Sequence, residues 1–410
     1  MLNKFKLTYK IHRTKKQTLM LFSAQLICLL IGFFSNIFLA KEMGDYYFGL
    51  YSFAIAVITF IAIFFEFGFF SSISRLLATN NNIEQEKELI GISIIILGLI
   101  ILLFIIVIFG ISYIIDDYLD DKIGNLLFLT SFFSWSFTIP YYLELVLKGC
   151  NRIEYLSLFN LTWKLLFGLY LIYFYCFFRV IPLNTLFALS ITSIIPFLYI
   201  LIRFNPSFTS IKTNFLKVYE EYQSFGYHIY IGRIASVSTY NLDKLLIGYL
   251  LGAKDVGYYS LANSMASPIT IFSVSLSHSN FKSFSNRNPI SSSIIKTNIK
   301  WILFAFICSN FLGLIIVLYL GNNYYDVLLL LFIMSIALSI QANDQPYNAW
   351  LNCNGFGNEM KKLCVTSGII NTILNILLIV LFDTIGAALA CLLSRAYIYI
   401  SCYRLYLTKK

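Results

Sequence analysis

The chain has 410 residues, of which 59% are hydrophobic and only 12% are charged. Soluble domains carry about a quarter charged residues, so this composition excludes a soluble globular enzyme and equally a disordered or fibrous chain. The net charge of +10 comes from basic residues in short gaps between apolar runs, which predicts a polytopic membrane protein facing anionic lipid and no nucleic-acid partner.

Apolar runs long enough to cross a bilayer fill most of the chain. About 20 helical residues, rising 1.5 Å each, cross a hydrocarbon core of about 30 Å. By this measure the sequence predicts twelve transmembrane helices, at residues 19–40, 47–70, 89–115, 124–147, 154–178, 183–204, 224–251, 256–281, 297–320, 325–350, 363–382 and 384–406. The last two are separated by so short a gap that we expect a tight helical hairpin.

The distribution of Lys and Arg predicts the orientation. With the N-terminus in the cytoplasm, 22 basic residues fall in cytoplasmic segments, and only four fall in outer loops, namely Lys41, Lys122, Arg179 and Lys254. This bias predicts a multi-pass protein of the cell inner (cytoplasmic) membrane with both termini cytoplasmic. The acidic cluster at residues 116–121 then falls in an outer loop. No outer loop is long enough to form a domain, which counts against a membrane polymerase or oligosaccharide transferase.

A short segment recurs after 208 residues. Gly44 to Ala54 and Gly252 to Ala262 share the frame G-x4-G-x-Y-S-x-A, and each falls in the predicted outer turn between the first and second helix of a half. We expect the glycines to permit a tight turn and the small Ser and Ala to permit close helix packing. The repeat predicts an all-α fold of two parallel six-helix bundles, at residues 1–210 and 211–410, as in secondary transporters.

The seventh predicted span carries a polar stripe at bilayer depth. Its members lie within about 100° of a 3.6-residue helix, and they are Arg233, Ser236, Tyr240, Asp243 and Lys244. A shift of 208 residues places Gln25 and Asn36 at matching positions of the first span. Two symmetry-related polar faces are what a shared central cavity requires.

Other ionisable residues also fall inside spans, where their burial costs several kcal/mol and marks functional candidates. They are Glu66, Glu144, Lys164, Asp344 and Arg395. Glu144 and Asp344 lie near the inner interface, where snorkelling or pairing is an alternative interpretation. For Asp243 and Lys244 the alternative is a structural pair that neutralises itself.

Basic groups outnumber acidic groups near the predicted bilayer centre. Because Arg and Lys bind phosphate oxygens, and Tyr and Asn suit sugar hydroxyls, the balance predicts an anionic, sugar-bearing substrate. The candidate substrate-binding residues are Arg233, Lys244, Arg395, Lys164, Tyr240, Gln25 and Asn36. The candidate ion-coupling carboxylates are Asp243, Glu66 and Asp344.

Sequence motifs for catalysis are missing. The sequence contains no Walker motif, GxGxxG fingerprint, GxSxG elbow or HExxH motif, and its eight cysteines form no CxxC pair. We therefore expect no enzymatic activity, no cofactor and no metal. Any energy for transport would come from an ion gradient, the membrane potential or coupled metabolism.

The repeated outer turn at Gly44 to Ala54 and the segment Asn241 to Gly252 resemble motifs of Wzx-type O-antigen and polysaccharide flippases. These belong to the multidrug/oligosaccharidyl-lipid/polysaccharide (MOP) exporter superfamily, with the MATE exporters. The resemblance implies a MATE-like, alternating-access carrier that moves undecaprenyl-pyrophosphate-linked oligosaccharide (O-antigen, capsule or exopolysaccharide units) from the cytoplasmic to the outer leaflet. It also implies membrane lipids, a polysaccharide polymerase and a chain-length regulator as partners. The alternative is a MATE-like cation-coupled drug antiporter, in which acidic groups should dominate the cavity.

Overall fold

The structure is a computed structural model that describes residues 2–80, 82–116, 123–150, 152–280, 284, 289–354 and 356–410. The side chains of some helical residues, among them 2–22, 231–233 and 235–241, are outside this description. Most of the acidic cluster predicted at 116–121 also lies outside the described residues. The described part consists of helices and their connections, without a strand.

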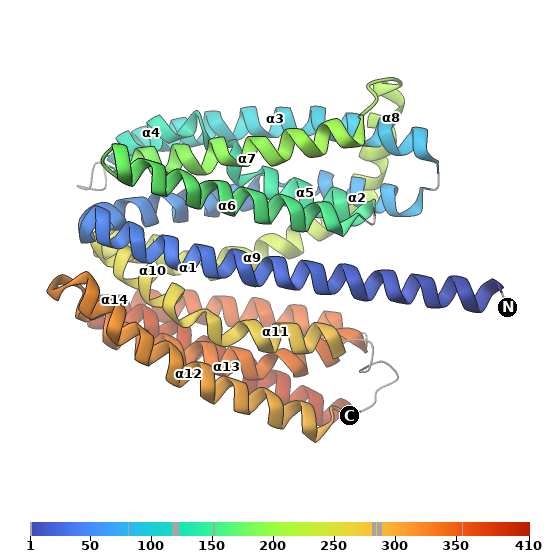
Figure 1. Cartoon of the computed structure of the whole chain (residues 1–410). Helices are drawn as coiled ribbons and strands as arrows, with labels where there is room; N and C mark the ends of the chain where they lie inside the picture. Colours follow the sequence, from blue (N-terminus) through green and yellow to red (C-terminus); the bar gives the residue numbers. More distant parts are fainter. Residues whose placement is uncertain are drawn as a thin grey trace. The chain divides into compact units, whose positions relative to one another are not determined.

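The helices follow one another with short connections (Figure 1). In chain order they are α1 (Leu2–Phe64), α2 (Phe69–Thr79), α3 (Ile83–Asp116), α4 (Ile123–Ser131), η1 (Ser134–Phe137), α5 (Ile139–Gly149), α6 (Ile153–Phe177), α7 (Pro182–Phe204), α8 (Ile211–Glu221), η2 (Tyr222–Gly226), α9 (Tyr227–Leu250), α10 (Ala253–Ala266), α11 (Pro268–Asn280), α12 (Ser292–Leu320), η4 (Asn322–Tyr324), α13 (Asp326–Cys353) and α14 (Gly357–Lys409). The segment η2 is a π-helix, and η1 and η4 are 3₁₀-helices.

Each predicted span corresponds to a helix, an arm of a helix or a pair of short helices. Among the described residues, seven helices are long and apolar enough to cross a membrane. Two of them, α1 and α14, contain two arms each, because the backbone leaves helical geometry at Gly44 and at Phe382 and Asp383. The arms of α14 fold back on each other, since Asn371 Nδ2 donates to Ser394 Oγ at 3.2 Å. The predicted all-α polytopic fold and its final hairpin are thus confirmed.

The chain forms two compact units. Among the described residues, the first comprises 2–35, 61–116 and 123–231, and the second comprises Asn36–Phe60 and Gly232–Lys410. The division passes through α1 and α9, so the returning arm of α1 belongs to the second unit. The boundary between sequence halves predicted at residues 210 and 211 stays a prediction.

In the first unit, large apolar side chains of α2, α3, α5 and α7 form one core. Phe70, Leu89, Tyr142 and Phe204 are all buried there. Several buried polar groups within this unit are paired, as most buried polar atoms are. The Tyr142 hydroxyl lies 2.9 Å from Ser93 Oγ, and α6 is joined to the neighbouring α7 by Trp163 Nε1, which donates to Leu189 O at 2.9 Å (Figure 1).

In the second unit, α13 is the central helix and contacts α10, α11, α12 and α14 (Figure 1). The returning arm of α1 packs on the start of α10 through the two copies of the sequence repeat. Their first glycines adopt the same turn geometry, with φ 77° and ψ 175° at Gly44 and φ 108° and ψ 175° at Gly252. Only glycine adopts such angles without strain. The predicted turn role of these glycines is confirmed.

The second glycine of each repeat copy lies where two backbones touch. A Cβ on Gly49 would be 2.2 Å from Ala253 O, and one on Gly257 would be 2.9 Å from Gly49 Cα. Beside this crossing Lys254 Nζ pairs with Asp45 Oδ2 at 3.0 Å. The hydrogen bond to the Asp45 carboxylate raises the pKa of the Lys254 ammonium to about 12.

Candidate functional site

The second unit contains a polar cavity of about 100 Å³ within an otherwise apolar helical bundle. Its walls come from α9, α10 and both arms of α14. The lining residues are Asp243, Lys244, Tyr259, Asn263, Ser367, Asn371, Cys391, Ser394 and Arg395. Three of the nine carry formal charges, and five others carry hydroxyl, phenol or amide groups. A cavity of this composition at bilayer depth is a candidate binding site.

Asp243 forms the acidic part of the cavity. Its side chain is buried and accepts two hydrogen bonds, one from Tyr259 Oη at 2.9 Å and one from Asn375 Nδ2 at 2.7 Å. A buried carboxylate is costly unless donors replace its water shell. The donors here come from α10 and from the first arm of α14, so the carboxylate ties α9 to both.

The first arm of α14 adds a row of polar side chains. Ser367, Asn371 and Asn375 are four residues apart and therefore share one helix face. Asn375 Nδ2 also donates to Asn371 Oδ1 at 3.0 Å, and Asn371 donates across the hairpin to Ser394. Asn375 Oδ1 is fully buried and has no hydrogen-bond partner in the described part of the chain. This oxygen is a free acceptor beside the Asp243 carboxylate.

Two positively charged side chains, Lys244 and Arg395, also line the cavity. Arg395 is oriented from both sides, because its Nη1 donates to Gln341 Oε1 and its Nε lies 3.0 Å from Cys391 Sγ. These contacts use two of the five N–H donors of a guanidinium. Lys244 contributes the second positive charge. Among the described residues, no direct ion pair joins either cation to a carboxylate. The cavity can therefore offer an anion the planar guanidinium of Arg395, which can donate two parallel hydrogen bonds, and the ammonium of Lys244.

The structure brings together three of the residues singled out in the sequence, Asp243, Lys244 and Arg395. Asn36 also belongs to the second unit, and its Nδ2 donates to Ser264 Oγ of α10 at 2.9 Å. The side chains of Arg233 and Tyr240 lie outside the described residues, so their predicted roles stay predictions.

Three further candidates lie in the first unit. Gln25 is exposed, and the Lys164 ammonium lies over the Trp163 ring, 5.0 Å from its centroid. Glu66 is buried and accepts a hydrogen bond from Ser71 Oγ at 3.1 Å. Their roles in substrate binding and ion coupling stay predictions.

Asp344 lies in the second unit but does not line the cavity. It is buried in α13, and its Oδ1 has no hydrogen-bond partner in the described structure. Glu144, for which snorkelling is the alternative interpretation, is exposed in the middle of α5. The sequence places both carboxylates near the inner membrane interface, but Asp344 is buried and Glu144 is exposed.

Several lining residues carry no charge, and uncharged polar residues stand out little within apolar spans. The spacing Ser367-x3-Asn371-x3-Asn375 is the signal that identifies one polar face. Tyr259 lies inside the repeated motif, which the sequence predicts to form an outer turn. Its hydroxyl instead holds Asp243.

Comparison with known proteins assigns the chain to a family. The model of a family described as "Polysaccharide biosynthesis protein" matches residues 14–279. The chain belongs to this family. A search of curated protein sequences found no match.

Solved structures with the same fold are transporters. The chain is similar to "Lipid II flippase MurJ, inward closed conformation", with 18% identity over 95% of this chain and 87% of that chain and a TM-score of 0.75. It is also similar to an inward-facing multidrug resistance MATE family transporter of the MOP superfamily, with 12% identity over 95% of this chain and 98% of that chain and a TM-score of 0.71. A third similar structure is that of the MATE multidrug transporter DinF-BH, with 13% identity over 96% of this chain and 94% of that chain and a TM-score of 0.63.

These likenesses establish the fold, which is that of MOP superfamily transporters. With the candidate spans among the described residues, they support a multi-pass membrane protein. The predicted resemblance to polysaccharide flippases is thereby confirmed at the level of the family.

Proposed function

We propose that this member of the polysaccharide biosynthesis family is a flippase for undecaprenyl-pyrophosphate-linked oligosaccharide, the repeat unit of an O-antigen, capsule or exopolysaccharide. It would move this substrate from the cytoplasmic to the outer leaflet of the inner membrane by alternating access. A polysaccharide polymerase and a chain-length regulator are its proposed partners.

The observation that carries the proposal is the charge of the cavity. Lys244 and Arg395 lie among amide and hydroxyl groups with one carboxylate, and that carboxylate is already held by Tyr259 and Asn375. The cations are therefore left for an anionic ligand. A diphosphate suits the Arg fork and the Lys ammonium, and sugar hydroxyls suit the amides.

A cation-coupled drug antiporter is the second candidate, and the Asp243 carboxylate is the observation that favours it. A drug cation or a coupling ion would bind this carboxylate and the free oxygen of Asn375. Asp243→Asn would then abolish ion-coupled drug efflux. The two cations beside Asp243 oppose this function, since like charges repel.

The test of the proposed function uses Arg395→Ala in a strain that carries the cognate glycosyltransferases and lacks its own flippase. Loss of a hydrogen bond to a charged group costs about 1.5–3 kcal/mol, or about 10- to 100-fold in transport. We expect surface polysaccharide to fall by that factor while lipid-linked oligosaccharide accumulates inside. Arg395→Lys keeps the charge without the fork and should be intermediate.

Arg404→Ala is the matched control, because Arg404 lies on the same arm of α14 and is exposed. It should behave as the unmodified chain. Normal surface polysaccharide in Arg395→Ala at normal expression would remove this cavity from substrate handling. An unmodified chain that restores drug efflux and no surface polysaccharide would instead support the antiporter.

A further inference from the structure

The short helix α8 stands apart from the spans. Its 11 residues, Ile211–Glu221, reach about 16 Å, which is too short to cross a bilayer. It belongs to the first unit, where it contacts α2 and α3. The π-helix η2 then connects it directly to α9.

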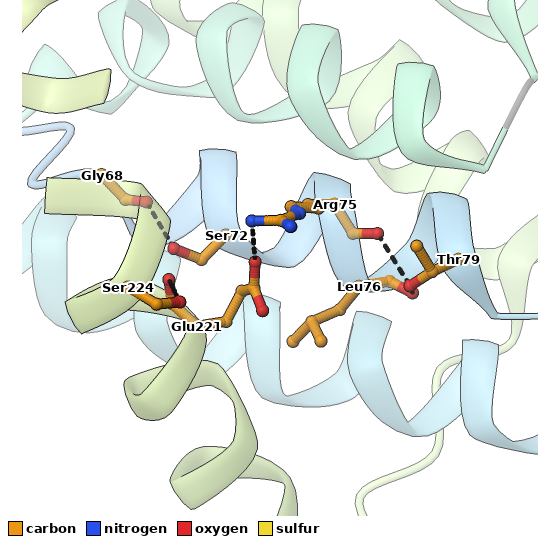
Figure 2. Close-up of polar contacts among 7 residues, drawn as sticks. All are labelled: Gly68, Ser72, Arg75, Leu76, Thr79, Glu221 and Ser224. Atoms are coloured by element: carbon orange, nitrogen blue, oxygen red, sulfur yellow. Dashed lines mark hydrogen bonds and ion pairs between the residues drawn. The ribbon is translucent and has the colours of Figure 1, made fainter. Parts of the chain in front are cut away.

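One face of α8 is fixed to the first unit. Asn214 and Val218 are buried, and Asn214 Nδ2 donates to Glu88 Oε2 of α3 at 3.0 Å. At the end of the helix Glu221 Oε1 pairs with Arg75 Nη1 of α2 at 2.9 Å, as Figure 2 shows. The Arg75 guanidinium also lies 4.6 Å from the centre of the Phe225 ring. These contacts fix the rotation of α8 about its axis.

The loop before α8 is also fixed to the first unit, through contacts with α3. The backbone N–H of Ser207 donates to Lys87 O at 3.0 Å, and Thr209 Oγ1 donates to Glu88 Oε1 at 2.8 Å. A Cβ on Gly91 of α3 would be only 2.0 Å from Ser207 O, so this approach requires glycine. The exposed face of α8 is therefore presented in one orientation.

That exposed face carries a stripe of large apolar side chains. Ile211, Phe215 and Tyr219 are four residues apart in α8 and have 42%, 41% and 42% of their surface exposed, and Phe208, 52% exposed, lies in the loop just before the helix. Phe215 and Tyr219 are stacked, with ring centres 6.4 Å apart. Isolated exposed apolar residues are normal on a surface, but a continuous ordered stripe indicates an interaction site.

The stripe continues toward the spans through aromatic stacking. Tyr219 stacks on Tyr222 at 6.1 Å, and Tyr222 stacks on Phe69 of α2 at 4.6 Å. Lys212 and Lys217 are exposed on the same helix. Lys212 lies next to the stripe on the side away from the docked face, since residues are about 100° apart around a helix.

We propose that α8 lies in the headgroup region of the membrane surrounding the protein, with the stripe between acyl chains and the Lys212 ammonium on anionic phospholipid. α8 packs on α3 near its first turn, where Glu84 and Glu86 mark the end of the apolar span. The stripe is therefore level with the headgroups. Aromatic residues and lysines are the residues that interfacial helices use there. This proposal does not depend on the transported substrate.

The test measures backbone hydrogen exchange of residues 208–221 in the full chain, with one copy per lipid nanodisc. Discs of phosphatidylcholine alone are compared with discs containing about 30% phosphatidylglycerol. A lysine near an anionic surface is worth about fivefold in binding, so we expect exchange about fivefold slower with phosphatidylglycerol. High salt should remove this difference.

Lys212→Gln should abolish the lipid dependence, while exchange in α3 stays unchanged as evidence of folding. Lys361→Gln is the matched control, since Lys361 is exposed and lies outside α8. It should keep the difference at residues 208–221. Equal exchange in both lipids would overturn the proposal. Slow exchange that requires two copies per disc would also overturn it, because the stripe would then bind a second chain.

Discussion

At the scale of single residues, the buried carboxylate of Asp243 shows how the fold accommodates charge inside the membrane. Tyr259 and Asn375 donate to its two oxygens from different helices. Each donor replaces water that the carboxylate loses on burial. The same interactions therefore stabilise the second unit and shape its cavity.

Tyr259→Phe tests this arrangement without changing side-chain volume. It removes the donor to Asp243 Oδ2, and a hydrogen bond to a charged group is worth about 1.5–3 kcal/mol. We expect the apparent melting temperature of the purified chain in detergent to fall by several degrees, as measured by intrinsic fluorescence.

Tyr249→Phe is the control for this substitution, because Tyr249 is exposed on the same helix as Asp243. It should change the melting temperature little. In an Asp243→Asn background, Tyr259→Phe should lower the melting temperature by less, since the hydrogen-bond acceptor is then neutral. Equal melting of Tyr259→Phe and the unmodified chain would show that the hydroxyl does not stabilise the carboxylate.

At the scale of helices, the repeated glycines determine how closely two elements approach. The returning arm of α1 and the start of α10 touch through backbone atoms at Gly49 and Ala253. Backbone atoms cannot move aside as a flexible side chain can. The contact therefore depends on the absence of a single methyl group.

Gly49→Ala should be strongly destabilising, because its Cβ would be 2.2 Å from Ala253 O. Gly98→Ala is the matched control, since a Cβ at this exposed position in α3 meets nothing within 4 Å. In a helix this control should be neutral or stabilising by about 0.5–1 kcal/mol. Size-exclusion chromatography and thermal melting would compare the folded fractions. A Gly49→Ala variant as stable as Gly98→Ala would contradict the close crossing.

Hydropathy predicts where the chain crosses the bilayer but not where a span is broken. The predicted span at 124–147 consists of α4, η1 and α5, and that at 256–281 consists of α10 and α11. Pro140 and Pro268 lie at the start of the second helix in each case. Pro196 and Pro346, however, lie inside continuous helices. Proline alone does not decide a break, because neighbouring helices can satisfy the freed backbone groups.

In the candidate site, the charged residues are predictable from the sequence, whereas their uncharged partners are not. Asp243, Lys244 and Arg395 are charges in apolar runs, so the cost of burying them identifies them from sequence. The partners that orient them, Asn375 and Gln341, are uncharged and come from other helices. Which faces of which helices meet depends on tertiary packing, which periodicity within one helix does not specify.

At the scale of the whole molecule, the distribution of basic residues predicts one orientation, with both termini in the cytoplasm. That orientation gives 22 Lys and Arg to cytoplasmic segments and four to outer loops, a bias that the opposite orientation would reverse. We expect green fluorescent protein fused after Lys410 to fluoresce and alkaline phosphatase fused there to be inactive. Alkaline phosphatase fused at Gly321, in the turn that ends α12, should be active. The reverse pattern would contradict this orientation and would place α8 on the outer side of the membrane.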